Sequence, residues 1–389
     1  MNAPVILGWA RSAVIPVGGA LGALAAHEIG APVLRGLLAR FGIPAGAVDA
    51  VVVGNALGAG GNPARMVALA AGLADRSAAL SVDTQCCAGL DAVSIAAGLL
   101  ASGGASVVVA GGVEAWSRAP IRQHRPRHAA ERPVDYDRPA FAPDPERDPD
   151  LLHAAARQAA LLSISRSRQD AFAAESHARA LALRDRMMAQ EIVPIGDATH
   201  DSYARPLTPA RMARMPIAAS AEAAPPDAID RPDTAVSRLA IAPRADGAAF
   251  VVMATPQAAA ALQLTPHFRW LGGASVGVAP EMPMLAAAEA ASALLQRARL
   301  GVDALWGLEL HEAFAVQALD FIQTLGIDPA RLNRGGGGLG RGHPIGASGA
   351  ISLVRLLSDM QCDAPPGAHG LAAIAGAGGV GAAGLVQRL

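Results

Sequence analysis

The chain carries an internal repeat, and this repeat restricts its fold more than any other feature of the sequence. Residues 48–55 read Val-Asp-Ala-Val-Val-Val-Gly-Asn, and residues 302–310 read Val-Asp-Ala-Leu-Trp-Gly-Leu-Glu-Leu. Both segments are typical of short buried strands. Each is followed by a glycine-bearing loop, an apolar helix and a second buried strand, which favours α/β layers. The doubling therefore predicts two similar halves that pack together, with a site between them.

Each copy of the repeat predicts where its helix and its second strand lie. In the first half we expect the helix over about residues 88–100 and the strand over 106–110. In the second half we expect the helix over about 347–357 and the strand over 371–375.

A different kind of sequence separates the two copies. Residues from about 118 to 233 are rich in Pro, Arg and Asp, and one helix is expected over about 150–183. The length of this segment suits an insertion that acts as a lid or substrate-binding subdomain.

Composition excludes several classes of function. Hydrophobic residues make up 52% of the 389 residues and charged residues 17%, which is typical of a compact protein. The net charge of −1 gives no reason to expect a nucleic-acid partner. No lysine is present, which excludes pyridoxal-phosphate enzymes and P-loop proteins because both need one. One basic cluster fits either a solvated loop or a patch that attracts a phosphorylated substrate: Arg118, Arg122, Arg125, Arg127 and Arg132.

The cysteines indicate a reducing compartment. Cys86, Cys87 and Cys362 cannot all pair, and two are adjacent, so we expect no disulfide framework. No pair has zinc-ligand spacing, and we expect no metal site. The N-terminus lacks the pattern of a secretory signal, and apolar stretches such as 99–113 are too short to span a bilayer. We therefore expect a cytoplasmic protein with no membrane partner.

Cys86 is the candidate nucleophile. It lies where a strand gives way to an apolar helix, and the positive end of the helix dipole favours a thiolate there. On this evidence alone a buried core cysteine is the simpler interpretation.

Two histidine motifs in the second half change that interpretation. Residues 309–314 read Glu-Leu-His-Glu-Ala-Phe, and residues 342–349 read Gly-His-Pro-Ile-Gly-Ala-Ser-Gly. His343 occupies the place in the second half that Cys86 occupies in the first. If the halves pack around a pseudo-dyad, the two helix starts converge, and a Cys–His pair there generates a thiolate nucleophile.

These motifs resemble those of the thiolase family, and the resemblance covers nearly the whole chain. Residues 86–90, Cys-Cys-Ala-Gly-Leu, are similar to the nucleophile motif Cys-x-Ser-Gly-Leu, and residues 111–114 to Gly-Gly-x-Glu. Residues 342–349 are similar to the family's most specific motif. Residues 311–314 match Asn-Glu-Ala-Phe in its histidine-bearing form, which resembles the fatty-acid-oxidation thiolases more than the short-chain acetoacetyl type.

The resemblance implies a fold and a domain division. The thiolase fold has two similar βαβ-type halves packed in α-β-α-β-α layers, with an inserted loop domain. The first half would comprise residues 1–117 with about 243–264, the insertion 118–242, and the second half 265–389. A homodimer or tetramer is expected.

The resemblance also implies a role for each site residue. Cys86 would attack an acyl thioester, and His343 would take the thiol proton and help bind the thioester oxygen. His311 would orient an oxyanion-binding water. The backbone N–H of Cys86 would form a second oxyanion hole with the loop at Ala377 and Gly378. The substrate would be a coenzyme A thioester, with no permanently bound cofactor.

The chain departs from the family pattern at two places. Ala375 stands where the Cys-x-Gly-Gly-Gly motif carries the acid/base cysteine, and the alternative position used by the sterol-carrier type is Ala313. A methyl group cannot transfer a proton. Residues 240–245, Ala-Ile-Ala-Pro-Arg-Ala, replace a serine-containing loop along the pantetheine path, which leaves an acyl-carrier thioester open as the donor.

Three hypotheses follow from these departures. The first is a thiolase-type acyltransferase, either an acetyl-CoA acetyltransferase or a 3-ketoacyl-CoA thiolase. The second is a relative that transfers or hydrolyses the acyl group on Cys86 without carbon–carbon bond chemistry. The third is a non-catalytic partner in a complex. Dinucleotide binding is disfavoured, because the glycine runs at 335–340 and 376–381 lack the strand and long helix of that fingerprint.

Overall fold

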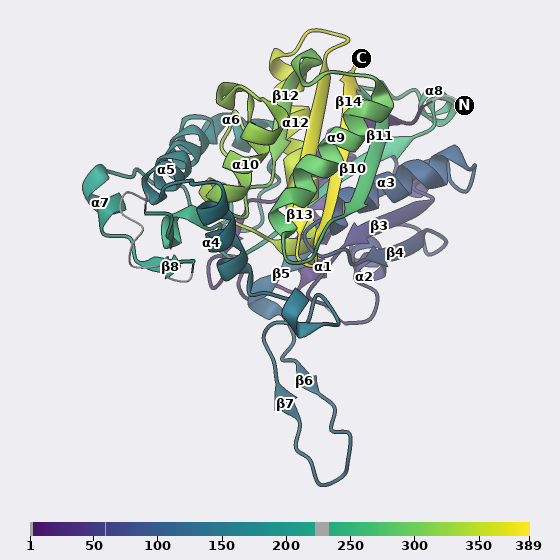
Figure 1. Cartoon of the computed structure of the whole chain (residues 1–389). Coiled ribbons are helices and arrows are strands. Elements are labelled where there is room, and N and C mark those ends of the chain that lie inside the picture. Colours follow the sequence, from purple (N-terminus) through teal and green to yellow (C-terminus); the bar gives the residue numbers. More distant parts are fainter. Residues whose placement is uncertain (1–2, 59, 222–232) are drawn as a thin grey trace.

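The computed structural model describes residues 3–58, 60–221 and 233–389, so residues 222–232 of the predicted insertion lie outside the described residues. Within this part of the chain, one ten-stranded mixed sheet is flanked by helices, and two small two-stranded sheets lie apart from it (Figure 1). No helix among the described residues is both long enough and apolar enough to cross a membrane.

The sheet has two halves that meet at β1 and β11. The first half contains, in spatial order, β1 (Val5–Arg11), β10 (Ala245–Ala254), β5 (Val107–Ala115), β3 (Ala50–Gly54) and β4 (Ala78–Val82), with β2 (Ile15–Pro16) beside β10. The second half contains β12 (Leu305–Leu310), β13 (His369–Gly376), β14 (Val380–Arg388) and β11 (Phe268–Gly277). Within the sheet, the described residues of β1 and β11 form two pairs across the boundary between the halves, Val5 with Arg269 and Ile6 with Phe268.

The predicted repeat is confirmed in this arrangement. In the first half α3 (Ala88–Ala101) leads from β4 into β5, which runs parallel to β3. In the second half α12 (Ser348–Asp363) leads into β13, which runs parallel to β12. Strand, helix and strand thus follow one another in the same order and sense in both halves.

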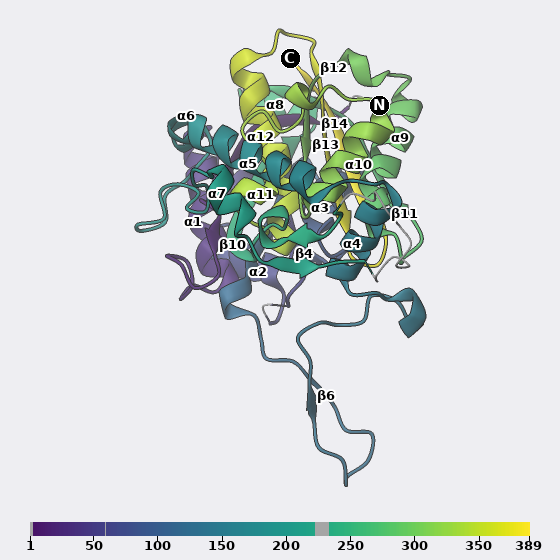
Figure 2. The ribbon, with the colours of Figure 1, turned by 60° about the vertical axis from the view of Figure 1, so that its left-hand side comes forward.

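The helices form three layers around the two halves of the sheet. Helices α3 and α12 lie between the halves, α1 (Ala26–Arg40) and α2 (Pro63–Ala70) cover the outer face of the first, and α9 (Ala286–Ala298) and α10 (Ala315–Leu325) cover the second (Figure 2). Side chains alternate between the faces of a strand. On β5, Val108 and Ala110 join the central core, whereas Val107 and Val109 join the core under α1. The expected five-layer thiolase architecture is therefore confirmed.

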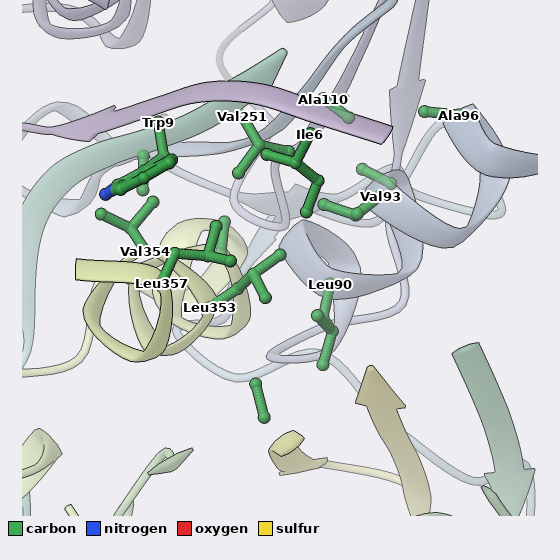
Figure 3. Packing of buried hydrophobic residues seen from close by; sticks show 14 of the residues in the cluster. Ile6, Trp9, Leu90, Val93, Ala96, Ala110, Val251, Leu353, Val354 and Leu357 are labelled. Atoms are coloured by element: carbon green, nitrogen blue, oxygen red, sulfur yellow. The ribbon is translucent and has the colours of Figure 1, made fainter. Parts of the chain in front are cut away.

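The central core holds the two middle helices against both halves. Figure 3 shows Leu353, Val354 and Leu357 of α12 facing Trp9 and its neighbours on the strands, with Leu90 and Val93 of α3 beside them. All these side chains are buried. Because α3 and α12 share this core, their starting ends are fixed relative to one another.

The described residues of the segment between the halves form four α-helices and two short two-stranded sheets rather than one helix. They are α4 (Leu151–Leu161), α5 (Arg166–Ala182), α6 (Arg184–Gln190) and α7 (Pro209–Ala213), with ribbons β6–β7 (Gln123–His124, Val134–Asp135) and β8–β9 (Ile217–Ala219, Val236–Ser237). The single helix expected over 150–183 was wrong. Ser163 has a left-handed φ of 53°, and the Ser165 side chain caps the start of α5, so the helix breaks there. The β6–β7 hairpin extends away from the body in Figures 1 and 2.

Candidate active site

Cys86 lies in a tight turn between β4 and α3. Gln85, the residue before it, has a φ of 54°, a backbone conformation that residues other than glycine rarely adopt. The backbone N–H of Gln85 donates to Oδ1 of Asp83 at 2.9 Å, which holds this conformation. The turn places Cys86 in the wall of a cavity, while Cys87 packs behind it near the carbonyls of Ile374 and Val380.

The structure brings Cys86 and His343 together. Sγ of Cys86 lies 3.2 Å from Nε2 of His343. On the other side of the ring, Nδ1 lies 2.8 Å from Oγ of Ser348, whose hydroxyl donates to the Pro344 carbonyl at 2.9 Å. Oγ of Ser348 therefore accepts a hydrogen bond from the Nδ1–H of His343, which leaves the lone pair of Nε2 directed at the thiol. This arrangement is the one that a general base for Cys86 would need.

Burial keeps both members of this pair neutral in the resting site. Burial raises the pKa of the Cys86 thiol to about 12, although the backbone N–H groups of Ala377 and Cys86 favour the thiolate. Burial also lowers the pKa of His343 to about 4. The thiolate expected from the helix dipole is therefore not the resting form, because desolvation outweighs the dipole. Deprotonation has to accompany attack on the substrate.

His311 lies against His343 but outside the cavity wall. The two imidazole rings are 4.4 Å apart between centroids. Nε2 of His311 is buried and has no hydrogen-bond partner in the described part of the chain. Burial, together with the neighbouring His343 and Arg341, lowers the pKa of His311 well below its ordinary value. His311 is thus a neutral ring with one unused polar atom next to the Cys–His pair.

The C-terminal glycine loop closes the site opposite His343. Ala375 and Ala377 contribute to the cavity wall, and the Ala377 N–H is directed at the Cys86 sulfur. Gly378 does not contribute to the wall, and its φ of 81° turns the chain past Phe141. Ala375, where the sequence resemblance leads us to expect a departure from the family pattern, thus lies in the cavity wall.

Glu114 fastens the two halves together beside the site. Its carboxylate accepts the side-chain N–H of Asn55 and the backbone N–H groups of Ala56 and Gly346, all within 3.0 Å. Burial raises its pKa to about 7 despite these donors. Gly346 lies three residues after His343, so this contact fixes the histidine loop to the first half.

A buried ionic cluster lies beneath the two histidine loops. Glu309 lies two residues before His311, and Arg341 lies two residues before His343, with 3.7 Å between Oε2 and Nη2. Burial raises the pKa of Glu309 to about 8, against the attraction of Arg341 and Arg355. The cluster contains three arginines and four acids: Arg11, Arg341, Arg355, Glu191, Asp201, Asp359 and Glu309.

The Cys86 cavity has a volume of about 660 Å³. This size is within the usual range for small-molecule and cofactor sites. Its walls come from the Cys86 turn, from the segment between the halves, and from the second half. Across the described ranges, no three His, Cys, Asp or Glu side chains lie close enough together to hold a metal ion.

Some residues of the site were not found from the sequence. Ser348 belongs to the quoted histidine motif, but only its hydrogen bonds show that it selects the His343 tautomer. Trp116 and Arg244, far apart in the chain, meet in the cavity wall with the guanidinium 5.0 Å from the indole ring. No local sequence signal connects residues so distant from each other.

The chain matches the family "Thiolase, N-terminal domain" over residues 4–257 and the family "Thiolase, C-terminal domain" over residues 264–388. The chain therefore belongs to the thiolase family.

Curated relatives and solved structures agree with this assignment. The chain is 35% identical to "Putative acetyl-CoA C-acetyltransferase YhfS" of Bacillus subtilis, over 93% of each chain. It is 31% identical to "Putative acetyl-CoA C-acetyltransferase VraB" of Staphylococcus aureus over the full length of both. The Acat5 thiolase from Ascaris suum in complex with coenzyme A superposes with a TM-score of 0.89 at 27% identity, with full coverage of both chains. The acetyl-CoA acetyltransferase of Bacillus anthracis gives a TM-score of 0.89 at 28% identity, over 100% of this chain and 99% of that one.

Proposed function

We propose that this protein is an acyltransferase that takes the acyl group of an acyl-CoA onto Cys86. The observation that carries the proposal is the 3.2 Å contact between Sγ of Cys86 and Nε2 of His343, with the tautomer of His343 set by Ser348. Family membership and the coenzyme A complex of the Ascaris suum relative support a coenzyme A thioester as the donor.

In the proposed reaction, His343 removes the Cys86 proton as the sulfur attacks the thioester carbonyl carbon. The negative oxygen of the tetrahedral intermediate is stabilised by the backbone N–H groups of Cys86 and Ala377. The carbon–sulfur bond to coenzyme A then breaks, and the imidazolium of His343 returns the proton to the departing thiolate. The products are acyl-Cys86 and free coenzyme A, with no oxidant or metal required.

A rapid-quench experiment tests this reaction. The protein is mixed with acetyl-CoA or a longer acyl-CoA, quenched in acid, and analysed for free coenzyme A. We expect a burst of about one equivalent per subunit, which Cys86→Ala abolishes and the matched control Cys87→Ala retains. A wild-type protein without a burst for any donor would rule out the acyltransferase and favour a non-catalytic partner.

A second candidate function is transfer or hydrolysis of the acyl group without a carbon–carbon step. The observation that favours it is that Ala375 lines the cavity. Carbon–carbon bond chemistry needs a proton transfer to or from carbon, and the methyl group of an alanine cannot supply it. General acid–base catalysis typically raises a reaction rate by about 10²–10⁴-fold. We expect acylation without acetoacetyl-CoA cleavage in the wild type and a gain of cleavage in Ala375→Cys. The control Ala377→Cys places a thiol on the same loop and should give no gain.

A further inference from the structure

Four arginines line the Cys86 cavity, and two of them are already engaged. Nη2 of Arg122 donates to the Leu57 carbonyl at 2.8 Å, and Arg138 forms an ion pair with Asp148. Both therefore hold the cavity wall itself. The other two are Arg238 and Arg244.

Arg238 and Arg244 have no acidic partner among residues 3–58, 60–221 and 233–389. Two acids also line the cavity, Asp137 and Asp150, but Asp150 caps α4 by accepting the Leu152 N–H at 2.8 Å. The cavity therefore has an excess of positive charge. Such an excess attracts an anionic group, and a guanidinium binds a carboxylate through two parallel hydrogen bonds.

Arg244 is connected to the Cys–His pair through Trp116. Its guanidinium lies 5.0 Å from the centre of the Trp116 ring, which in turn lies 6.5 Å from the His343 ring. The backbone next to Arg244 is fixed as well, because the His343 N–H donates to the Pro243 carbonyl at 2.8 Å. One indole ring thus separates the free cation from the Cys–His pair.

The cavity wall also contains apolar side chains. Ile241, Pro243 and Met284 contribute to it, and Ile241 pairs with Phe314 across the wall. This combination fits methylene groups that end in an anion. The phosphates of coenzyme A are the other anionic source, but the whole pantetheine arm separates them from the thioester.

We propose that the acyl group accepted by this site carries a terminal carboxylate, which Arg244 and Arg238 bind. The substrate class is a thioester of a dicarboxylic acid. This inference rests on the proposed acylation of Cys86, which it makes more specific.

The test compares two phosphate-free thioesters of equal chain length, adipyl- and hexanoyl-N-acetylcysteamine. We expect wild type to be acylated faster by the adipyl thioester at limiting concentration, by about tenfold or more, as expected of a hydrogen bond to a charged group. Arg244→Gln and Arg238→Gln should remove this preference, because each slows acylation by the adipyl thioester more than acylation by the hexanoyl thioester. Arg214→Gln, at an exposed arginine that does not line the cavity, is the matched control and should change neither rate.

Equal wild-type acylation rates for the two thioesters would overturn the inference. A further experiment repeats the rate measurements with adipyl-CoA and hexanoyl-CoA. If the arginine variants slow acylation by both of these equally but leave acylation by the phosphate-free thioesters unaffected, the arginines bind coenzyme A and the inference is overturned.

Thioester binding to Cys86→Ala, measured by calorimetry, does not depend on acylation. If no thioester acylates the wild type, the proposed function fails, whereas tighter adipyl binding that is lost in Cys86→Ala/Arg244→Gln still supports the inference.

Discussion

Oγ of Ser348 accepts a hydrogen bond from the Nδ1–H of His343, and its own hydroxyl donates to the Pro344 carbonyl. This relationship determines which nitrogen of His343 can act as a base. The geometry of the Cys86 site therefore depends on a residue that is not part of the described cavity wall.

Replacing Ser348 with alanine should slow the acylation of Cys86. Without the hydroxyl, His343 is free to carry its proton on Nε2, where it cannot accept the thiol proton. We expect a fall of about ten- to a hundredfold, part of the 10²–10⁴-fold range of general-base catalysis. Thioester binding to Cys86→Ala and Cys86→Ala/Ser348→Ala, compared by calorimetry, should be the same. Weaker binding in the double variant would assign Ser348 to substrate binding instead.

The pH dependence of Cys86 reactivity follows from its neutral resting state. Because burial raises the thiol pKa to about 12, alkylation by iodoacetamide should rise about tenfold per pH unit up to pH 10 without levelling off. Because the pKa of His343 is lowered to about 4, acylation by a thioester should decline only below about that pH. Circular dichroism at each pH checks that the protein stays folded. A plateau of alkylation near pH 7 would instead indicate a resting thiolate–imidazolium pair.

Glu309→Gln should change the pH dependence of stability. The folded protein keeps Glu309 protonated up to a pKa of about 8, whereas the unfolded chain ionises near 4.5. The folded state thus binds this proton more tightly, so its stabilising contribution is complete below pH 4.5 and is lost as the pH rises through 8. The loss is on the order of a few kcal/mol.

Thermal melting of both proteins from pH 4 to pH 9 measures this effect. The two melting temperatures should be closest at pH 4, and Glu309→Gln should become progressively more stable than wild type towards pH 9. A difference that is independent of pH would show that Glu309 is ionised throughout and paired with Arg341.

Two glycines of the first half should respond in opposite ways to alanine. A Cβ on Gly112 would clash with the Gly346 carbonyl oxygen, so Gly112→Ala has to separate the two halves. Gly98 lies exposed on α3 with open space around it, and Gly98→Ala should stabilise by about 0.5–1 kcal/mol through helix propensity. Urea unfolding of the two variants measures both effects. Equal stability of the two would contradict the close packing of the halves.

The sequence predicts the layers and the nucleophile turn because these depend on local patterns. Buried strands and apolar helices have short periods, and the doubled order of elements places Cys86 and His343 at equivalent positions. The break between α4 and α5 was missed, because Ser163 and Ser165 act through backbone conformation within an otherwise helical pattern.

Protonation states and distant contacts could not be predicted in this way. The helix dipole alone favours a thiolate at Cys86, but the extent of desolvation is a property of the packed core. Trp116 follows β5 and Arg244 precedes β10, so the two side chains meet only when these strands pair in the sheet. The positive charge of Arg244 in the cavity wall depends on the same pairing. The departure at Ala375 stays a prediction from the sequence resemblance, and the structure adds that Ala375 lines the cavity.

The most direct test of the roles of Cys86 and His343 is the mass of the intact protein after incubation with an acyl-CoA. We expect one added acyl group on the wild type and on Cys87→Ala, none on Cys86→Ala, and a slow gain on His343→Ala. Hydroxylamine should remove the added mass, as it does for a thioester. An adduct that persists in Cys86→Ala, or that forms at the wild-type rate in His343→Ala, would contradict the assignment of Cys86 and His343 as nucleophile and base.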